Sequence, residues 1–114
     1  MSKPLLTCKS MSGRIVCLSE SVWFEKILKA HPEFKERSEY LEEIKRTVEE
    51  PDYIIIGWAG EYLALRFCEM APKGPKHLCV IYRELDDEGF IITTFFISKM
   101  QKLLRRGMVW RRRK

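Results

Sequence analysis

The sequence predicts an α+β fold in which two N-terminal helices pack on a four-stranded antiparallel sheet, followed by a short C-terminal helix and a basic tail. Apolar residues before Pro51 recur at helical spacing, whereas apolar residues after Pro51 alternate along the chain. The loops between the alternating segments are short, and short loops connect antiparallel neighbours. A chain of 114 residues is long enough for one hydrophobic core. We therefore expect a single domain over residues 1–114.

The helical part is predicted to begin after residue 18. Residues 13–18 are apolar and β-branched, which is typical of a strand or an extended arm. We therefore divide the chain into an N-terminal arm or strand (residues 1–18), a core (19–106) and a basic tail (107–114). Ser19 and Ser21 offer N-cap side chains, and the apolar residues that follow indicate a first helix ending near Ala30.

The tripeptide His31-Pro32-Glu33 interrupts the helical pattern. Proline disfavours helical geometry at the residue before it and fits the first turn of a new helix. An apolar stripe then predicts a second, longer helix over residues 32–50, with acidic side chains on its solvent face and an end at Pro51. His31 is therefore expected at a joint between two helices.

Four strands are predicted after Pro51, at residues 53–58, 62–70, 77–84 and 89–98, and a last helix at residues 99–106 ends at Gly107. In the second strand we expect Leu63, Leu65 and Phe67 to face the helices. Arg66 then projects from the open face, where a guanidinium needs water or an anion. In the last strand both faces are apolar, so alternation does not tell whether Thr93 or Thr94 is exposed.

The charge is unevenly distributed along the chain. The formal net charge is +5, from 21 basic and 16 acidic residues. Residues 99–114 hold eight bases and no acid, so the other 98 residues sum to −3. A cluster such as residues 111–114 binds polyphosphate by releasing counterions, or it is a solvated tail.

Several protein classes are excluded by the composition. The longest apolar runs fall far short of the roughly 20 residues that a membrane-spanning helix needs, and the first residues lack an export signal, so we expect a cytoplasmic protein. The four cysteines include no C-x-x-C pair, which argues against a structural metal site. We interpret them as small buried packing residues.

Four short motifs carry a family resemblance, and they occur in this order: His31-Pro32-Glu33, the pair Arg37 and Tyr40, Pro51-Asp52-Tyr53-Ile54, and Gly89-Phe90-Ile91-Ile92-Thr93-Thr94-Phe95-Phe96. Over residues 23–110 the chain resembles the phage-type nuclease domains of the barnase, EndoU, colicin and RelE-like superfamily, known as the BECR fold. The resemblance implies two helices followed by a four-stranded antiparallel sheet. It also implies a small ribonuclease, of the toxin or phage-effector type, that needs no metal and no other cofactor.

The resemblance also implies roles for single residues. The helix-joint histidine of the family corresponds to His31, its helix arginine to Arg37 and the threonine of its last strand to Thr93. Thr94 stands where the family has a small residue, and Phe95 stands where it has a tyrosine, so one hydroxyl donor is missing. Arg66 is a further candidate for phosphate binding.

These residue types suit metal-free cleavage of RNA. The reaction needs a base for the 2′-OH proton, an acid for the leaving 5′-oxygen, and fixed donors for the charge on the phosphate. His31 supplies a base or an acid near neutral pH, with Glu33 or Tyr82 as its partner and His77 as the alternative histidine. Arginines hold the phosphate, and Thr93 or Thr94 adds a hydroxyl.

RNA is therefore the expected partner, and a toxin of this kind also implies a cognate inhibitor or antitoxin protein. Aromatic and basic side chains are the expected substrate contacts: Tyr62, Tyr82, Lys76, Arg105, Arg106, Arg111 and Arg112. Two alternatives stay open from the sequence. One is a non-catalytic nucleic-acid-binding module that uses the basic C-terminus. The other is a protein-interaction domain that uses the acidic face of the second helix.

Overall fold

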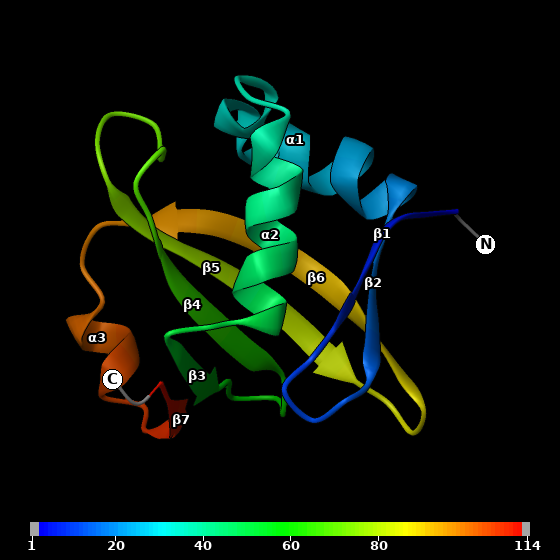
Figure 1. Ribbon diagram of the computed structural model, residues 1–114, viewed down its shortest axis with the longest axis vertical. Helices are drawn as coiled ribbons and strands as arrows, with labels where there is room; N and C mark the ends of the chain where they lie inside the picture. The colour runs from blue at the N-terminus through cyan, green and yellow to red at the C-terminus, as the bar shows by residue number, and fades with distance from the viewer. Residues whose placement is uncertain (1–2, 113–114) are drawn as a thin grey trace.

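The computed structural model describes residues 3–112, with all of their side chains except those of Met108 and Val109. The α+β class is confirmed, but the sheet is larger than predicted. It has seven strands in the order β1-β2-β6-β5-β4-β3-β7, and it is mixed rather than antiparallel. Figure 1 shows that α2 lies across one face of this sheet.

The strands are β1 (Pro4–Lys9), β2 (Ile15–Ser19), β3 (Tyr53–Ile56), β4 (Tyr62–Cys68), β5 (Lys76–Glu84), β6 (Glu88–Ile97) and β7 (Met108–Arg111). The helical segments are η1 (Val22–Ile27), α1 (Leu28–Ala30), η2 (Pro32–Lys35), α2 (Glu39–Glu49) and α3 (Gln101–Leu104). Strands β3 to β6 pair with their sequence neighbours in antiparallel fashion, as the short loops predicted.

The N-terminal residues form two strands of the sheet rather than an arm outside the core. β1 and β2 make an antiparallel hairpin, in which Gly13 has a φ of 90°, and β2 pairs in parallel with β6. A side chain at Gly89 of β6 would place its Cβ 2.5 Å from the carbonyl oxygen of Arg83, so only glycine fits there. The pairing of β2 with β6 joins residues about 70 positions apart, and no local sequence pattern predicts it.

Both predicted N-terminal helices are wrong in their detail. The first consists of the π-helix η1, in which the Leu28 N–H reaches the carbonyl of Trp23, and a single turn, α1. The second is divided into the 3₁₀ turn η2 and the α-helix α2, which begins at Glu39 rather than at residue 32. Pro32 stands at the first position of η2, where its missing N–H costs nothing.

The C-terminal prediction also needs correction. The helix predicted over residues 99–106 is limited to α3, and the expected tail contains the strand β7. This strand pairs with β3, so that Tyr53 lies opposite Arg111 and Ile54 opposite Trp110. Gly107, with a φ of 101°, reverses the chain between α3 and β7. Arg113 and Lys114, which the sequence placed in the basic tail, lie outside the described residues.

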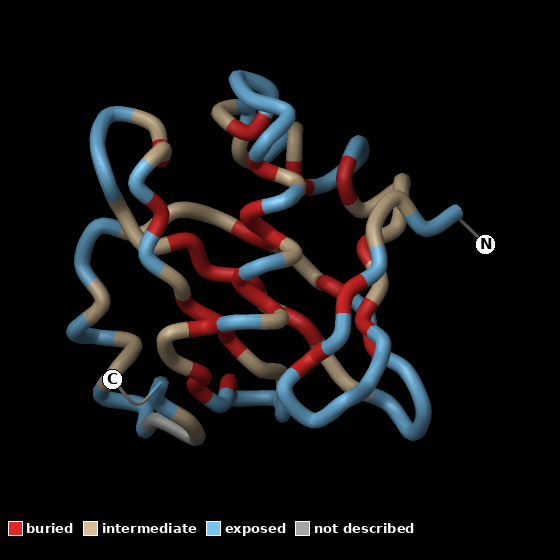
Figure 2. Tube along the Cα trace, viewed as in Figure 1, coloured by how far each residue is buried: buried red, intermediate tan, exposed pale blue. Residues whose placement is uncertain are grey.

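Two apolar clusters cover the two faces of the sheet. The larger one lies between the sheet and the helices and includes Phe34, Tyr40 and Ile44, and Figure 2 shows buried backbone where β4, β5 and β6 pass beneath α2. The smaller one contains Leu63, Leu65 and Cys79 on the opposite face, which we call the outer face, and residues of α3 pack against it. No helix within residues 3–112 is long and apolar enough to cross a membrane.

The predicted orientation of β4 is therefore reversed. Ala64 and Cys68 belong to the cluster on the helix side, whereas Leu63 and Leu65 belong to the outer face. Because β4 is apolar on both faces, its alternation sets which residues share a face but does not tell which face meets the helices. Arg66, which shares a face with Ala64, points toward the helices and not toward an open surface.

Candidate functional site

His31 lies at the joint between α1 and η2, where the sequence placed it. Its N–H donates to the carbonyl of Ile27, and its backbone leaves helical geometry with φ −135° and ψ 73°. The imidazole packs on two rings, with centroid distances of 6.5 Å to Phe34 and 6.0 Å to Phe95. Its Nδ1 lies 3.8 Å from a carboxylate oxygen of Glu33. The side chain is about one-third exposed, so solvent can reach it.

A bulge in β6 decides where its two threonines point. β6 has one extra residue between the pairs Tyr82 with Ile91 and Ile81 with Thr93. Thr93 therefore shares the outer face with Phe95, the residue on which His31 packs. Thr94 points the other way, is fully buried, and its hydroxyl donates to the carbonyl of Cys79 at 2.7 Å. The structure thus brings His31 and the Thr93 segment together and places Thr94 in the core.

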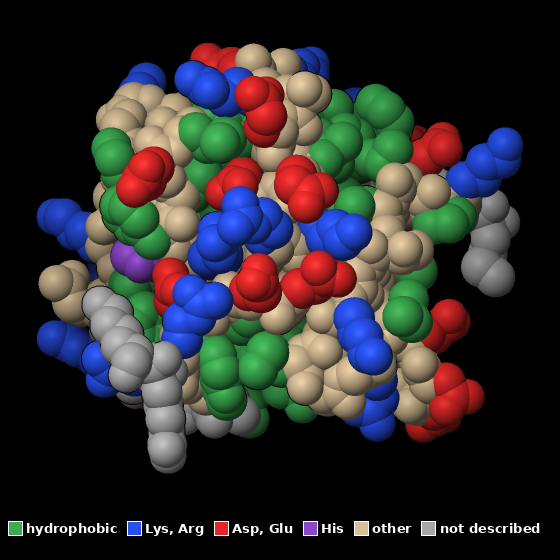
Figure 3. Space-filling view, viewed as in Figure 1, with side chains coloured by type: hydrophobic (Ala, Val, Ile, Leu, Met, Phe, Trp, Pro, Cys, Tyr) green, Lys and Arg blue, Asp and Glu red, His purple; other side chains and the backbone are tan. Residues whose placement is uncertain are grey.

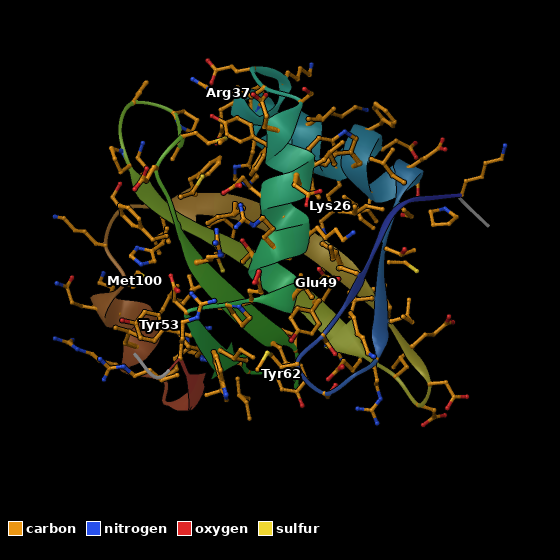
Figure 4. The ribbon with its side chains drawn as sticks, viewed as in Figure 1. Lys26, Arg37, Glu49, Tyr53, Tyr62 and Met100 are labelled. Atoms are coloured by element: carbon orange, nitrogen blue, oxygen red, sulfur yellow. The ribbon has the colours of Figure 1, made fainter. Side chains whose placement is uncertain are left out.

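Arg37 is exposed on the segment between η2 and α2. Figure 4 shows it at one end of the molecule, whereas Tyr62 lies near the opposite end of α2. The structure therefore does not bring these two predicted site residues together. Burial raises the pKa of the nearby Tyr40 hydroxyl, and the charge of Arg37 opposes this rise.

Arg66 forms an ion pair with a residue of α2. Its Nη1 lies 3.8 Å from a carboxylate oxygen of Glu43 on α2, and the two side chains are 19% and 11% exposed. The Nε atom of Arg66 is buried and has no hydrogen-bond partner. A second arginine, Arg46, approaches the other oxygen of Glu43 at 3.9 Å from the solvent side. The expected projection of Arg66 toward an open face is thus wrong, because α2 covers it.

The rings of Tyr62 and Tyr82 contact each other in a tilted arrangement, and Tyr62 lines a pocket. Their ring centroids lie 5.6 Å apart, and Tyr82 is buried, which raises the pKa of its hydroxyl. The pocket has a volume of about 430 Å³, and its lining residues are Arg14, Tyr62, Glu84, Leu85 and Asp86. The Glu84 carboxylate already accepts hydrogen bonds from the hydroxyls of Ser10 and Ser12.

The predicted basic substrate contacts differ in their surroundings. The guanidinium of Arg106 lies 4.9 Å from the ring centroid of Trp58, and that of Arg111 lies 6.0 Å from the ring centroid of Tyr53. Arg112 lies 3.7 Å from the carboxylate of Asp52. Arg105 is exposed, whereas Lys76 donates its ammonium to the carbonyl of Pro72. The arginines before and within β7 thus line a surface on which aromatic rings are already present.

Sequence reasoning missed an aromatic cluster on the outer face. The His77 ring lies 5.4 Å from the ring centroid of Phe67 and 6.5 Å from that of Tyr53. Burial lowers the pKa of His77, and the negative charge of Asp52 partly opposes this shift. The carboxylate of Asp52 accepts the N–H of Phe67 at 2.8 Å. The sequence signal for this cluster is the presence of aromatic residues in neighbouring strands. It predicts contacts only when the register between those strands is known.

The helix side of the molecule carries charges of both signs. Figure 3 shows Lys and Arg side chains intermingled with Asp and Glu over α2 and its surroundings. Within residues 3–112, no group of three or more His, Cys, Asp and Glu side chains is arranged to hold a metal ion.

The sequence model of one protein family matches residues 5–111 of the chain. This family is described as phage-Barnase-EndoU-ColicinE5/D-RelE like nuclease2. The match covers nearly the whole fold, including the N-terminal hairpin and β7. No curated protein and no solved structure matches the chain.

Proposed function

The chain belongs to the phage-Barnase-EndoU-ColicinE5/D-RelE like nuclease2 family, and from this premise we propose that it is an endoribonuclease that cleaves RNA without a metal cofactor. The catalytic centre in this proposal lies where the joint between α1 and η2 meets β6. The observation that carries it is the packing of His31 on Phe95, with a centroid distance of 6.0 Å. This contact joins two of the four motifs that carry the family resemblance, although they are about 60 residues apart in sequence.

Within residues 3–112, the edge of β6 at this point is not paired with another strand. β2 pairs only with residues 88–90 of β6, so residues 91–97 have no strand partner on that side within the part of the chain that the structure describes. His31 stands beside this edge and reaches the outer face at Phe95. An RNA strand that runs along the outer face would thus bring its phosphates past the imidazole.

The chemistry follows from these side chains. His31 accepts the proton of the ribose 2′-OH, and the 2′-oxygen then forms a bond to phosphorus while the bond from phosphorus to the 5′-oxygen breaks. The leaving 5′-oxygen takes up a proton from solvent water, so the products carry a 2′,3′-cyclic phosphate and a 5′-hydroxyl. The Glu33 carboxylate, 3.8 Å from Nδ1, orients the ring and stabilises the positive charge that the imidazole takes on.

In this proposal two further residues bind the phosphate. Thr93 shares the outer face with Phe95, and its hydroxyl is assigned to a phosphate oxygen. Arg37 is exposed a few residues beyond His31, and its guanidinium is assigned to the charge that develops on the phosphate. Arg66 and Thr94 are left out of the reaction, because Glu43 and the Cys79 carbonyl engage them.

The test is cleavage of single-stranded RNA in excess EDTA. We expect His31→Ala to lower kcat by about 100-fold to 10,000-fold, the usual range for loss of a general acid or base. Lys29→Ala, an exposed change on α1 two residues away, serves as the matched control and keeps the rate. Cleavage that survives in His31→Ala, or that requires added Mg²⁺, would contradict the proposal.

A second candidate function is supported by one observation. The described part of the basic C-terminal segment, residues 99–112, contains no acid, which favours salt-sensitive binding of nucleic acid even without catalysis. RNA retention by a wild-type protein that cleaves nothing would select this function. If the enzyme acts as a toxin in the cytoplasm, we also expect an acidic inhibitor protein that covers the same basic segment.

A further inference from the structure

The outer face has an exposed aromatic ring beside a histidine. Both lie at the end of the sheet where β4 ends and β5 begins. Phe67 is 46% exposed, although its strand neighbours Leu65 and Cys68 are buried. Its ring meets the His77 imidazole edge to face, with an interplanar angle of 70°. The backbone N–H of Phe67 donates to the Asp52 carboxylate, which anchors the main chain at this position. An exposed ring on a paired strand offers a surface for stacking.

Tyr53 extends this surface across the sheet. It lies opposite Leu65 of β4 and opposite Arg111 of β7, and its ring is 6.5 Å from His77. Figure 4 shows Tyr53 beside Met100, at the boundary of the segment that leads into α3. Tyr53 and Met100 both pack against the outer-face cluster. The platform is thus bordered by α3 on one side and remains open around Phe67.

Arg111 supplies a cation at the edge of this platform. Its guanidinium lies 6.0 Å from the Tyr53 ring centroid, and within residues 3–112 it makes no ion pair with an acid. Asp52, which precedes Tyr53 in the chain, forms its ion pair with Arg112 at 3.7 Å. A guanidinium that lies on an aromatic ring still has N–H donors for a phosphate. The segment 99–112, to which Arg111 belongs, contains five further basic residues and no acid.

We propose that Tyr53, Phe67 and His77, together with Arg111, form a binding site for an unpaired base of single-stranded RNA and its adjoining phosphate. The inference rests on the proposed function, since it assigns a substrate subsite to the same outer face. An exposed aromatic ring on a sheet stacks a base whose face is free, which a duplex does not offer. A second aromatic and arginine pair, Trp58 and Arg106, follows at the other end of β3 and extends the path, since Trp58 is 86% exposed.

The experiment measures binding apart from cleavage. The probe is a 12-nucleotide RNA that is 2′-O-methylated throughout, so that the 2′-oxygen cannot attack, and binding is followed by fluorescence anisotropy in EDTA. We expect Phe67→Leu to weaken binding about tenfold, because leucine keeps the apolar volume but removes the stacking face. Phe24→Leu is the matched control, since Phe24 is 53% exposed on η1. It should leave the affinity unchanged.

Arg111→Gln tests the phosphate contact. The slope of log affinity against log salt concentration should become shallower by about 0.7, the value for one phosphate contact on a single strand. Arg46→Gln is the control, because Arg46 is similarly exposed but lies on α2, on the other side of the sheet. Thermal unfolding of each variant confirms that the fold is intact.

The outcomes separate this inference from the proposed function. If Phe67→Leu and Phe24→Leu weaken binding equally, if duplex RNA competes as well as the single strand, or if the wild type does not bind the probe, the subsite is disproved. Cleavage of ordinary RNA by the same protein would then still uphold the proposed function. Conversely, selective loss of binding in Phe67→Leu upholds the subsite even where the wild type cleaves no RNA.

Discussion

Arg66 and Glu43 form an ion pair between the middle of β4 and the face of α2 that covers it, with Nη1 and Oε1 3.8 Å apart. Both side chains are largely removed from water, and the pair is the link between helix and sheet that the sequence did not predict. A guanidinium at this depth needs a carboxylate, since an unpaired buried charge is costly. The pair therefore explains why a charged residue is tolerated on the buried face of β4.

The first prediction concerns the stability that this pair controls. Glu43 contacts two arginines, of which Arg66 is 19% exposed and Arg46 is 48% exposed. Glu43→Ala should lower the free energy of unfolding by about 3 kcal/mol, because it leaves Arg66 buried and unpaired. Arg46→Ala should lower it by less than about 1 kcal/mol, as is usual for an exposed pair. Urea denaturation of both variants measures the difference, and equal losses would show that burial does not matter here.

The second prediction separates the two adjacent threonines of β6. Thr94→Val removes a buried hydrogen bond to Cys79, so we expect a loss of about 1 kcal/mol in stability and an unchanged rate of RNA cleavage. Thr93→Val should do the reverse, with normal stability and a reduced kcat. Denaturation and cleavage assays on both variants give the answer. A loss of activity that follows Thr94 instead would mean that β6 presents its other face to the substrate.

The third prediction follows from the lowered pKa of His77. Below its ordinary value of about 6.5, the unfolded chain binds a proton on this imidazole that the folded protein does not bind. Folding stability contributed by His77 is therefore complete above pH 6.5 and declines as the pH falls toward the lower folded-state pKa. Urea midpoints between pH 5 and 8 should show this decline in the wild type and a smaller one in His77→Gln. The same slope in both proteins would refute the assignment.

The fourth prediction concerns the cysteines. Cys8, Cys68 and Cys79 are free and buried, and burial raises the pKa of these thiols to about 12, about 11 and about 12. Cys17 is only partly buried. With iodoacetamide at pH 8, we expect the native protein to be alkylated at Cys17 first and at the other three only after unfolding. Peptide mass spectrometry locates the label, and Cys17→Ser should abolish labelling of the native state.

Much of the central sheet could be predicted from the sequence, because its signals are local. Period-two patterns and short turns locate β3 to β6 to within a few residues, and Pro32 marks the joint where His31 stands. The periphery could not be predicted in this way. β2 and β7 pair with strands that are far away in sequence. The arginines around Trp110 give β7 the composition of a solvated tail, so the sequence did not predict a strand there.

In the candidate site, too, some features follow from local sequence and others depend on the tertiary structure. The position of His31 follows from a motif, but its contact with Phe95 depends on the path of β6. The direction of Thr93 depends on a bulge, and that of Arg66 on which face of a doubly buried strand meets α2. The cluster of His77 with Phe67 appears only once the register of β4 and β5 is known. Side-chain direction in a sheet that is apolar on both faces is the information that the local pattern lacks.

The most direct test of the account is the chemical nature of the ends that the protein leaves on a defined single-stranded RNA in excess EDTA, measured by mass spectrometry. Attack by the 2′-hydroxyl predicts a 2′,3′-cyclic phosphate on one product and a 5′-hydroxyl on the other, both absent with His31→Ala. A 5′-phosphate and a 3′-hydroxyl, or intact RNA until Mg²⁺ is added, would contradict it.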